Sequence, residues 1–193
     1  MCTSPNIPER RKTPPLRGSL VKWEYTNTVS KITLSMCLAD AGIVRVTYFP
    51  GAVPEDEPSY AVSPGYSAPG AEIREYDEDG VHVVETSLLR IRIRTEEQKV
   101  DFYDVATDEP LLTDEGGFGR ESKDWTGDAR VWIRKNLQET EHFFGLGDKP
   151  CALNLRGKYF SMWGADHYDF HEESDPLYKS IPFFLSLRER KAY

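Results

Sequence analysis

The stretch ITLSMCLADAGIVRVTY, residues 32–48, decides the fold class. Apolar side chains at positions 32, 34 and 36 alternate with the hydroxyl side chains of Thr33 and Ser35, and a period of two is typical of a β-strand. A turn at residues 40–42 leads into a second alternating run over residues 44–48. These features predict an antiparallel hairpin with one face buried and the other in contact with water.

Similar hairpins follow along the rest of the chain. Turn residues at 78–80 and 108–110 separate alternating runs, and the last clear strand covers residues 181–187. The glycine-bearing stretch 115–119 is predicted to be a loop, and no helical pattern follows it as a phosphate-binding loop would require. No segment has a sustained helical period, so the chain is predicted to be an all-β antiparallel sandwich.

One of the predicted strands carries a row of positive charge. Apolar side chains at 89, 91 and 93 share one face of this strand, and arginines at 90, 92 and 94 share the other. Such a row could bind an anion, but charged rows on sheets are usually solvated faces. We therefore interpret the row as structural.

The 193 residues fit one domain, and 39% hydrophobic with 29% charged residues is typical of a folded protein. Residues 1–17 are predicted to form an extended proline-rich tail, because prolines at 5, 8, 14 and 15 interrupt both helix and central strand. The sandwich domain is then predicted over residues 18–193. A second proline-rich stretch, residues 50–70, is predicted to be a long surface connection within that domain.

The charge balance argues against nucleic acid as a partner. The formal net charge is −8, and the one basic cluster, Arg10-Arg11-Lys12, lies in the predicted tail. The sequence predicts no membrane span, no disulfide framework, no metal site and no cofactor. With three scattered cysteines and no signal-peptide pattern, the chain is predicted to be cytoplasmic, provided that no leader has been removed.

The segment 141–193 is the most informative about function. It contains FFGLGDK at 143–149, LNLRGK at 153–158, MWGAD at 162–166 and DPLYKSIPFF at 175–184. In this order and spacing the motifs resemble the end of the N-terminal domain of glycoside hydrolase family 31 enzymes of the α-glucosidase type. The family pattern there runs F-Y-G-L-G-E-K/R, L-N-x-R-G, W-N-x-D and Y-K-S-I-P-F.

The resemblance implies a galactose-mutarotase-like β-sandwich followed by a (β/α)₈ barrel that hydrolyses terminal α-linked sugars with retention. Retaining hydrolysis needs two carboxyl groups ~5 Å apart, and the family carries both on the barrel. The partners implied are therefore an oligosaccharide or α-glucoside substrate and the barrel of the same enzyme. This chain is expected to lack the catalytic carboxylates and to hold a sandwich that is incomplete at its C-terminus, since Ala192 and Tyr193 would stand inside a strand.

The same resemblance implies one substrate-binding residue, Asp166, which matches the aspartate of the W-N-x-D motif. A carboxylate accepts two hydroxyl hydrogen bonds at once and so suits neighbouring hydroxyl groups of a sugar. The chain departs from the pattern at Gly164, which replaces asparagine, and at Asp148, which replaces glutamate. No catalytic residue is assigned to this chain.

Three alternatives remain beside this interpretation. Trp163 could stack on a sugar, but a tryptophan between strands is more often part of a core. The acidic run over residues 166–175 lacks the ligand order of a calcium loop, and His167 and His171 do not lie on a convincing helix that would present them to zinc. The alternative function is a stand-alone sandwich that binds carbohydrate or protein without hydrolase activity, and the sequence that follows Tyr193 would distinguish the two.

Overall fold

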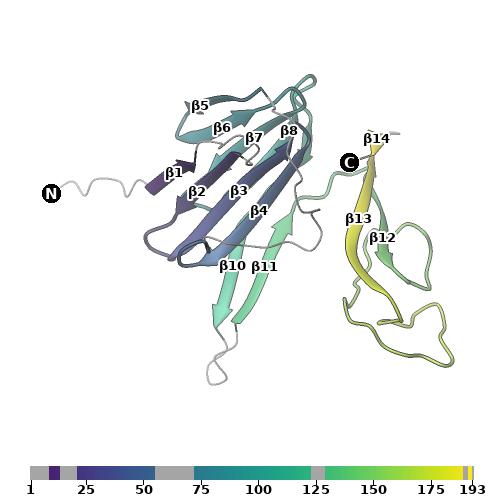
Figure 1. Ribbon diagram of the computed structural model, residues 1–193. Coiled ribbons are helices and arrows are strands. Elements are labelled where there is room, and N and C mark those ends of the chain that lie inside the picture. Colours follow the sequence, from purple (N-terminus) through teal and green to yellow (C-terminus); the bar gives the residue numbers. More distant parts are fainter. Residues whose placement is uncertain (1–8, 14–20, 55–71, 123–128, 189–190, 193) are drawn as a thin grey trace. The chain divides into compact units, whose positions relative to one another are not determined.

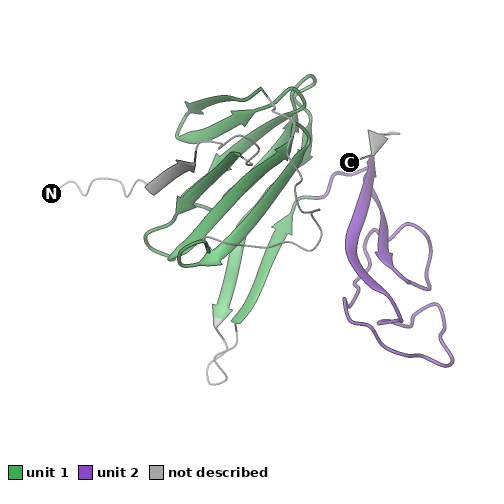
Figure 2. Cartoon of the chain, in the orientation of Figure 1, with its two compact units in different colours: residues 1–136 green, residues 137–193 purple. Residues whose placement is uncertain are grey.

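The computed structural model describes residues 9–13, 21–54, 72–122, 129–188 and 191–192. Within these ranges the chain consists of strands, turns and irregular segments, and none of it is helical. The prediction of an all-β protein is therefore confirmed. Within the same ranges no helix is long and apolar enough to cross a membrane. The chain divides into two compact units, residues 1–136 and 137–193 (Figure 2).

The described residues of unit 1 form three antiparallel sheets (Figure 1). The first has the order β1-β2-β3-β4, formed by Glu9–Thr13, Val21–Thr26, Ile32–Asp40 and Ile43–Pro50. The second has the order β5-β6-β7-β8-β9, formed by Arg74–Glu78, Val81–Glu85, Leu89–Arg94, Lys99–Asp104 and Pro110–Leu112. The third pairs β10 (Asp114–Ser122) with β11 (Ala129–Lys135). The turns predicted at 40–42, 78–80 and 108–110 each join two of these strands.

The core of unit 1 lies between the first two sheets. Its buried side chains come from β2 and β3 on one side and from β6, β7 and β8 on the other, namely Trp23, Tyr25, Leu34, Met36, Leu38, Val84, Ile91, Ile93, Val100 and Phe102. Each large apolar side chain removed from water contributes ~1.5–3 kcal/mol, so this shared layer holds the two sheets face to face. The arrangement is a sandwich, as predicted.

The sequence predicts that the second face of β3 is in contact with water, and this prediction is wrong. Thr33 and Ser35 on that face are only 3% and 6% exposed. The Thr33 hydroxyl donates to the Gly51 carbonyl at 2.6 Å, which lets this polar face be buried at little cost.

The arginine row lies on β7, in the middle of its sheet. Arg90 pairs with Glu85 at 2.6 Å, Arg92 lies 3.4 Å from Glu78, and Arg94 pairs with Asp101. The hydrogen bond from Arg90 lowers the pKa of Glu85. Carboxylates of β5, β6 and β8 therefore neutralise the row, so the arginines have a structural role but do not form a simply solvated face.

The prediction of a loop at 115–119 is wrong, because these residues belong to β10. The pairing of β10 with β11 shifts register between Asp114 and Phe118, and Gly116 and Gly117 lie in this irregular part of the strand. Gly117 has a φ of 68°. At Gly119 a Cβ would lie 2.1 Å from Trp132 of β11, so the missing side chain leaves room for the indole ring. The glycines here serve a bulged strand.

The two proline-rich stretches are only partly described. Of the predicted tail, Glu9–Thr13 forms β1 and pairs with β2, while residues 1–8 and 14–17 lie outside the described residues. Residues 55–70 of the predicted surface connection also lie outside them.

Unit 2 is one antiparallel sheet with a long connection. Its order is β12 (His142–Gly147), β13 (Ser180–Arg188) and β14 (Lys191–Ala192), so the strand predicted at 181–187 is confirmed. Residues 148–179 join β12 to β13 without regular secondary structure. This connection, called the 148–179 loop below, contains the predicted site residue.

Candidate functional site

The two ends of the 148–179 loop are joined to each other. The Asp148 amide donates to the Lys179 carbonyl at 3.0 Å. Gly147 precedes this bond with a φ of 85°, and a Cβ there would lie 2.3 Å from the Lys179 oxygen. Only glycine permits so close an approach, so the loop leaves and re-enters the sheet at one point.

The first part of the loop folds back on β12. The Leu155 amide donates to the Phe143 carbonyl at 2.8 Å, and the Phe143 amide donates to the side-chain oxygen of Asn154 at 3.2 Å. The Arg156 guanidinium donates to the carbonyls of Gln138 and Glu141, both at 2.8 Å. The LNLRGK motif therefore has a structural role. Its central residues bond the loop to β12 and to the segment directly before that strand.

The second part of the loop is held by a buried ion pair. Lys149 has a side chain that is only 2% exposed, and its Nζ donates to Asp175 Oδ1 at 2.6 Å and to the Ser161 carbonyl at 3.0 Å. The other carboxylate oxygen of Asp175 accepts the Ser161 amide. The ammonium group also lies 5.1 Å from the centre of the Phe160 ring. We call this arrangement of Lys149, Asp175 and Ser161 the loop clamp.

The loop clamp keeps Asp175 charged. Burial alone would raise the pKa of this carboxyl group, but the hydrogen bonds from Lys149 and from the Ser161 amide outweigh it and lower the pKa below 3.8. The group is therefore a carboxylate at neutral pH. Removing either partner would leave the other charge without its counterion, and this destabilises the folded protein.

Asp166, the predicted substrate-binding residue, lies on the surface of this loop. Its two neighbours in sequence, Ala165 and His167, each make one hydrogen bond through the backbone. The Ala165 amide donates to the Leu177 carbonyl at 3.1 Å, and the Tyr178 hydroxyl donates to the His167 carbonyl. Leu177 itself is 3% exposed. Among the described residues no hydrogen bond or ion pair involves the Asp166 carboxylate, so the backbone is held while the acid group is left available to a ligand.

Five aromatic side chains of the loop are exposed, namely Tyr159, Trp163, Tyr168, Phe170 and Tyr178. Trp163 is 72% exposed, so the prediction that it belongs to a core is wrong. That prediction assumed a tryptophan between strands, whereas residues 158–167 form an irregular segment outside the sheet. The exposed indole lies three positions before Asp166 on the same segment.

The acidic run of the loop does not gather around a common point. Asp169, Glu172 and Glu173 are exposed, while Asp175 belongs to the loop clamp. His171 Nδ1 accepts the Glu173 amide at 3.3 Å. Among the described residues no three His, Cys, Asp or Glu side chains are arranged to hold a metal ion.

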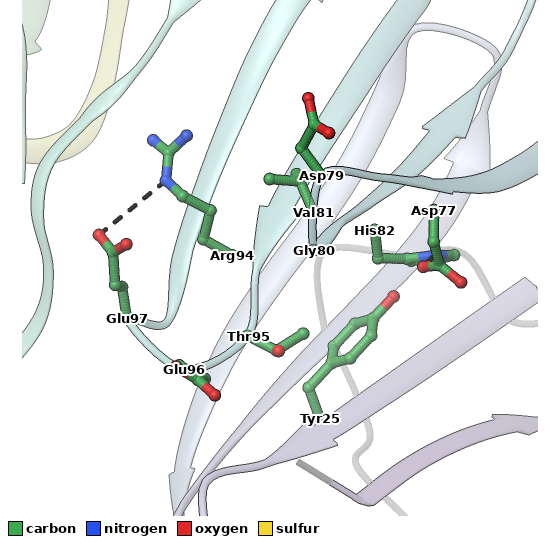
Figure 3. Close-up of a pocket in the computed structure, with 10 residues that line it drawn as sticks. All are labelled: Tyr25, Asp77, Asp79, Gly80, Val81, His82, Arg94, Thr95, Glu96 and Glu97. Carbon is green, nitrogen blue, oxygen red and sulfur yellow. Dashed lines mark hydrogen bonds and ion pairs between the residues drawn. The ribbon is translucent and has the colours of Figure 1, made fainter. Parts of the chain in front are cut away.

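Unit 1 contains a separate hollow of about 470 Å³, lined by β2, by the β5–β6 turn and by the β7–β8 turn (Figure 3). Several of its charged groups take part in ion pairs. His82 Nδ1 lies 3.1 Å from Asp77, Arg94 lies 4.0 Å from Glu97, and Glu97 also pairs with Lys99 at 2.7 Å. The hydrogen bond from Lys99 lowers the pKa of Glu97. These pairs stabilise the turns, and the 148–179 loop remains the candidate site.

Sequence reasoning selected Asp166 as a candidate but did not select the loop clamp. Lys149 lies inside the FFGLGDK motif, and Asp175 is the first residue of the DPLYKSIPFF motif and part of the acidic run, but neither is assigned a role from the sequence. The signal that could have identified these two residues is their position in the connection between β12 and β13. Once β12 and β13 are recognised as a hairpin, Lys149 and Asp175 stand near opposite ends of one connection and must approach each other.

Comparisons with known proteins agree with this geometry. Residues 33–193 match the family model described as the glycosyl hydrolase 31 N-terminal galactose mutarotase-like domain. Alpha-glucosidase 2 of Bacillus thermoamyloliquefaciens is 37% identical over 76 residues, which cover 39% of this chain and 10% of that protein. An alpha-glucosidase of Saccharolobus solfataricus is 37% identical over 60 residues, covering 31% of this chain and 9% of that protein.

A solved structure is similar over nearly the whole chain. The GH31 dextranase of Flavobacterium johnsoniae, as a mutant complexed with isomaltotriose, superposes with a TM-score of 0.73 and 25% identity. The match covers 96% of this chain and 21% of that one. The chain thus spans about a fifth of the dextranase, and its matches span about a tenth of the curated relatives.

Proposed function

The chain belongs to the family of glycosyl hydrolase 31 N-terminal galactose mutarotase-like domains, and from this premise we propose that it is the N-terminal domain of a larger α-glycosidase. The proposed enzyme is of the α-glucosidase type and hydrolyses terminal α-linked sugars with retention. The two alpha-glucosidase relatives and their much greater length support this proposal. The similar dextranase binds isomaltotriose, which favours an α-glucoside as the substrate class.

In this proposal the domain takes no covalent part in the reaction. The two catalytic carboxylates belong to a (β/α)₈ barrel elsewhere in the same protein, and the 148–179 loop contributes to the mouth of that barrel's active site. Asp166 accepts hydrogen bonds from sugar hydroxyls, and Trp163 offers an exposed aromatic face beside it. The predicted cytoplasmic location is part of the same proposal.

One observation carries the assignment of Asp166. Asp166 is exposed, while the Ala165 amide before it and the His167 carbonyl after it are bonded to residues 177 and 178. A surface aspartate with no role gains nothing from such support. A ligand-binding carboxylate gains affinity from it, because the geometry is fixed before the ligand arrives.

The test is Asp166→Ala in the complete enzyme, assayed on an α-linked disaccharide. Loss of a charged hydrogen bond to the substrate costs ~1.5–3 kcal/mol, so kcat/KM is expected to fall more than tenfold. Asp169→Ala is the matched control, because it removes an exposed carboxylate of the same loop and is expected to leave kcat/KM unchanged. Equal values for wild type and Asp166→Ala would assign Asp166 a structural role only.

The alternative, a stand-alone sandwich that binds carbohydrate or protein, is tested by activity and by sequence. The complete protein is assayed on a panel of p-nitrophenyl α-glycosides, and hydrolysis of at least one is expected. A complete reading frame without a barrel bearing two catalytic aspartates, together with no hydrolysis, would leave the binding function as the conclusion.

A further inference from the structure

Besides the backbone bond from Ala165 to Leu177, two contacts made by side chains support the Asp166 segment. The loop clamp fixes Ser161, five residues before Asp166, through Lys149 and Asp175. The Tyr178 hydroxyl fixes the His167 carbonyl, directly after Asp166. The residues that donate these bonds, Lys149 and Tyr178, stand near the two ends of the loop, where the Asp148 amide joins the Lys179 carbonyl.

From this arrangement we infer that Lys149 and Tyr178 are positioning residues, which orient the Asp166 carboxylate toward the sugar without touching the sugar themselves. The inference rests on the proposed role of Asp166 in substrate binding. It goes beyond that role because it assigns a function in substrate binding to Lys149 and Tyr178, whose hydrogen bonds are made to other residues of the loop.

The burial of the loop clamp supports this purpose. The Lys149 side chain is 2% exposed and has two oxygen partners within 3.0 Å, so its position is determined by the fold. A long connection without such bonds samples many conformations, and ordering it on ligand binding lowers the affinity. The loop clamp and the Tyr178 bond remove this cost before the substrate binds.

Positioning has a definite kinetic signature. When only a fraction of molecules hold Asp166 in the binding conformation, the apparent dissociation constant rises by the inverse of that fraction. Once the substrate is bound, the same complex reacts at the same rate. Weakening a positioning contact is therefore expected to raise KM and to leave kcat nearly unchanged.

Tyr178→Phe is the first variant, because it removes a single hydroxyl from a side chain that is 47% exposed and so is expected to fold. Loss of one neutral hydrogen bond corresponds to a KM increase of about 2- to 12-fold. Tyr168→Phe removes the hydroxyl of a fully exposed tyrosine on the same loop and is the matched control, with KM expected to stay at the wild-type value. Lys149→Met, which keeps an unbranched apolar stem, is the second variant and is expected to raise KM at least tenfold.

A double-mutant cycle separates positioning from general stability. In the complete enzyme carrying Asp166→Ala, adding Tyr178→Phe is expected to change neither KM nor kcat, because no carboxylate is left to orient. If Tyr178→Phe lowers kcat/KM by the same factor with and without Asp166, the bond supports only the fold and the inference is wrong.

The cycle also keeps this inference distinct from the proposed function. If Asp166→Ala lowers kcat/KM while Tyr178→Phe and Lys149→Met both match wild type, the role of Asp166 stands and the positioning role is overturned. If Asp166→Ala matches wild type, both fail together.

Discussion

Gly147 is the point at which the 148–179 loop leaves β12, and replacing it with alanine tests whether close backbone contact fixes the loop. The residue has a φ of 85°, a conformation that residues with a Cβ rarely adopt. A Cβ would lie 2.3 Å from the Lys179 oxygen, 3.0 Å from the Lys179 carbonyl carbon and 3.1 Å from the Ile181 nitrogen. All three are backbone atoms, so no side-chain rotation relieves the contact.

Two costs add in Gly147→Ala. The left-handed conformation costs ~1–2 kcal/mol for a residue with a Cβ. Overpacking against atoms that can move only with the backbone costs a further ~1–3 kcal/mol. The sum is ~2–5 kcal/mol, and it acts on the β12–β13 pairing that closes the loop.

Gly157→Ala is the matched control within the same loop. Gly157 has a φ of 76°, but nothing lies within 4 Å of the position its Cβ would take. Only the conformational cost applies, so ~1–2 kcal/mol is expected. The difference between the two variants isolates the contact with Lys179.

Amide hydrogen exchange followed by mass spectrometry measures this difference locally. Peptides covering β12 and β13 report the free energy of opening, and each 1.4 kcal/mol corresponds to a tenfold change in protection. Gly147→Ala is expected to lower protection in these peptides by more than about 30-fold, and Gly157→Ala by about 30-fold at most. Equal loss in both variants would refute the argument, because the backbone contact at Lys179 would then contribute nothing.

Three further predictions address the core, a thiol and the loop clamp. Ile91→Ala empties a fully buried position and is expected to cost ~2–5 kcal/mol, seen as a lower urea midpoint with an unchanged m-value. Burial raises the pKa of the Cys37 thiol above 9.0 despite nearby Arg45, so iodoacetamide at pH 8 is expected to alkylate it slowly until urea is added. The pKa of Asp175 is lowered in the folded state, so its charge stabilises the protein above about pH 4 and ceases to do so as the pH falls through the folded-state pKa. The difference in unfolding free energy between wild type and Asp175→Asn is therefore expected to be constant from pH 7 to about 4 and to shrink below that. A difference that persists at pH 2 would contradict it.

The sandwich could be predicted from the sequence because the information that specifies it is local. The alternation at 89–94 places Ile91 and Ile93 in the core, and the turn at 78–80 has positive φ at Asp79 and Gly80, as a tight hairpin requires. Each of these features acts within a few residues, so a period and a turn signal suffice to detect it.

The misjudged positions depend on neighbours that are distant in sequence. The burial of Thr33 follows from a hydrogen bond to Gly51, eighteen positions away. The strand conformation at Gly119 follows from the indole of Trp132 on the partner strand. Polarity and glycine content are average indicators of exposure and of loops, and both fail where one specific partner satisfies the polar group or fills the space.

The 148–179 loop combines local and distant information, and this explains why the sequence pointed to Asp166 as a candidate but not to the loop clamp. The motif around Asp166 is contiguous and can be compared with a family pattern directly. Lys149 and Asp175 are 26 positions apart, and in sequence Asp175 is one acidic residue among several. What selects it is closure of the hairpin. The bond between Asp148 and Lys179 joins the loop ends, so that a lysine just after one end and an aspartate just before the other meet in a space from which water is largely excluded. The other acidic residues of the run stand farther from Lys179 in sequence and are exposed, whereas Asp175 pairs with a lysine whose side chain the fold has buried.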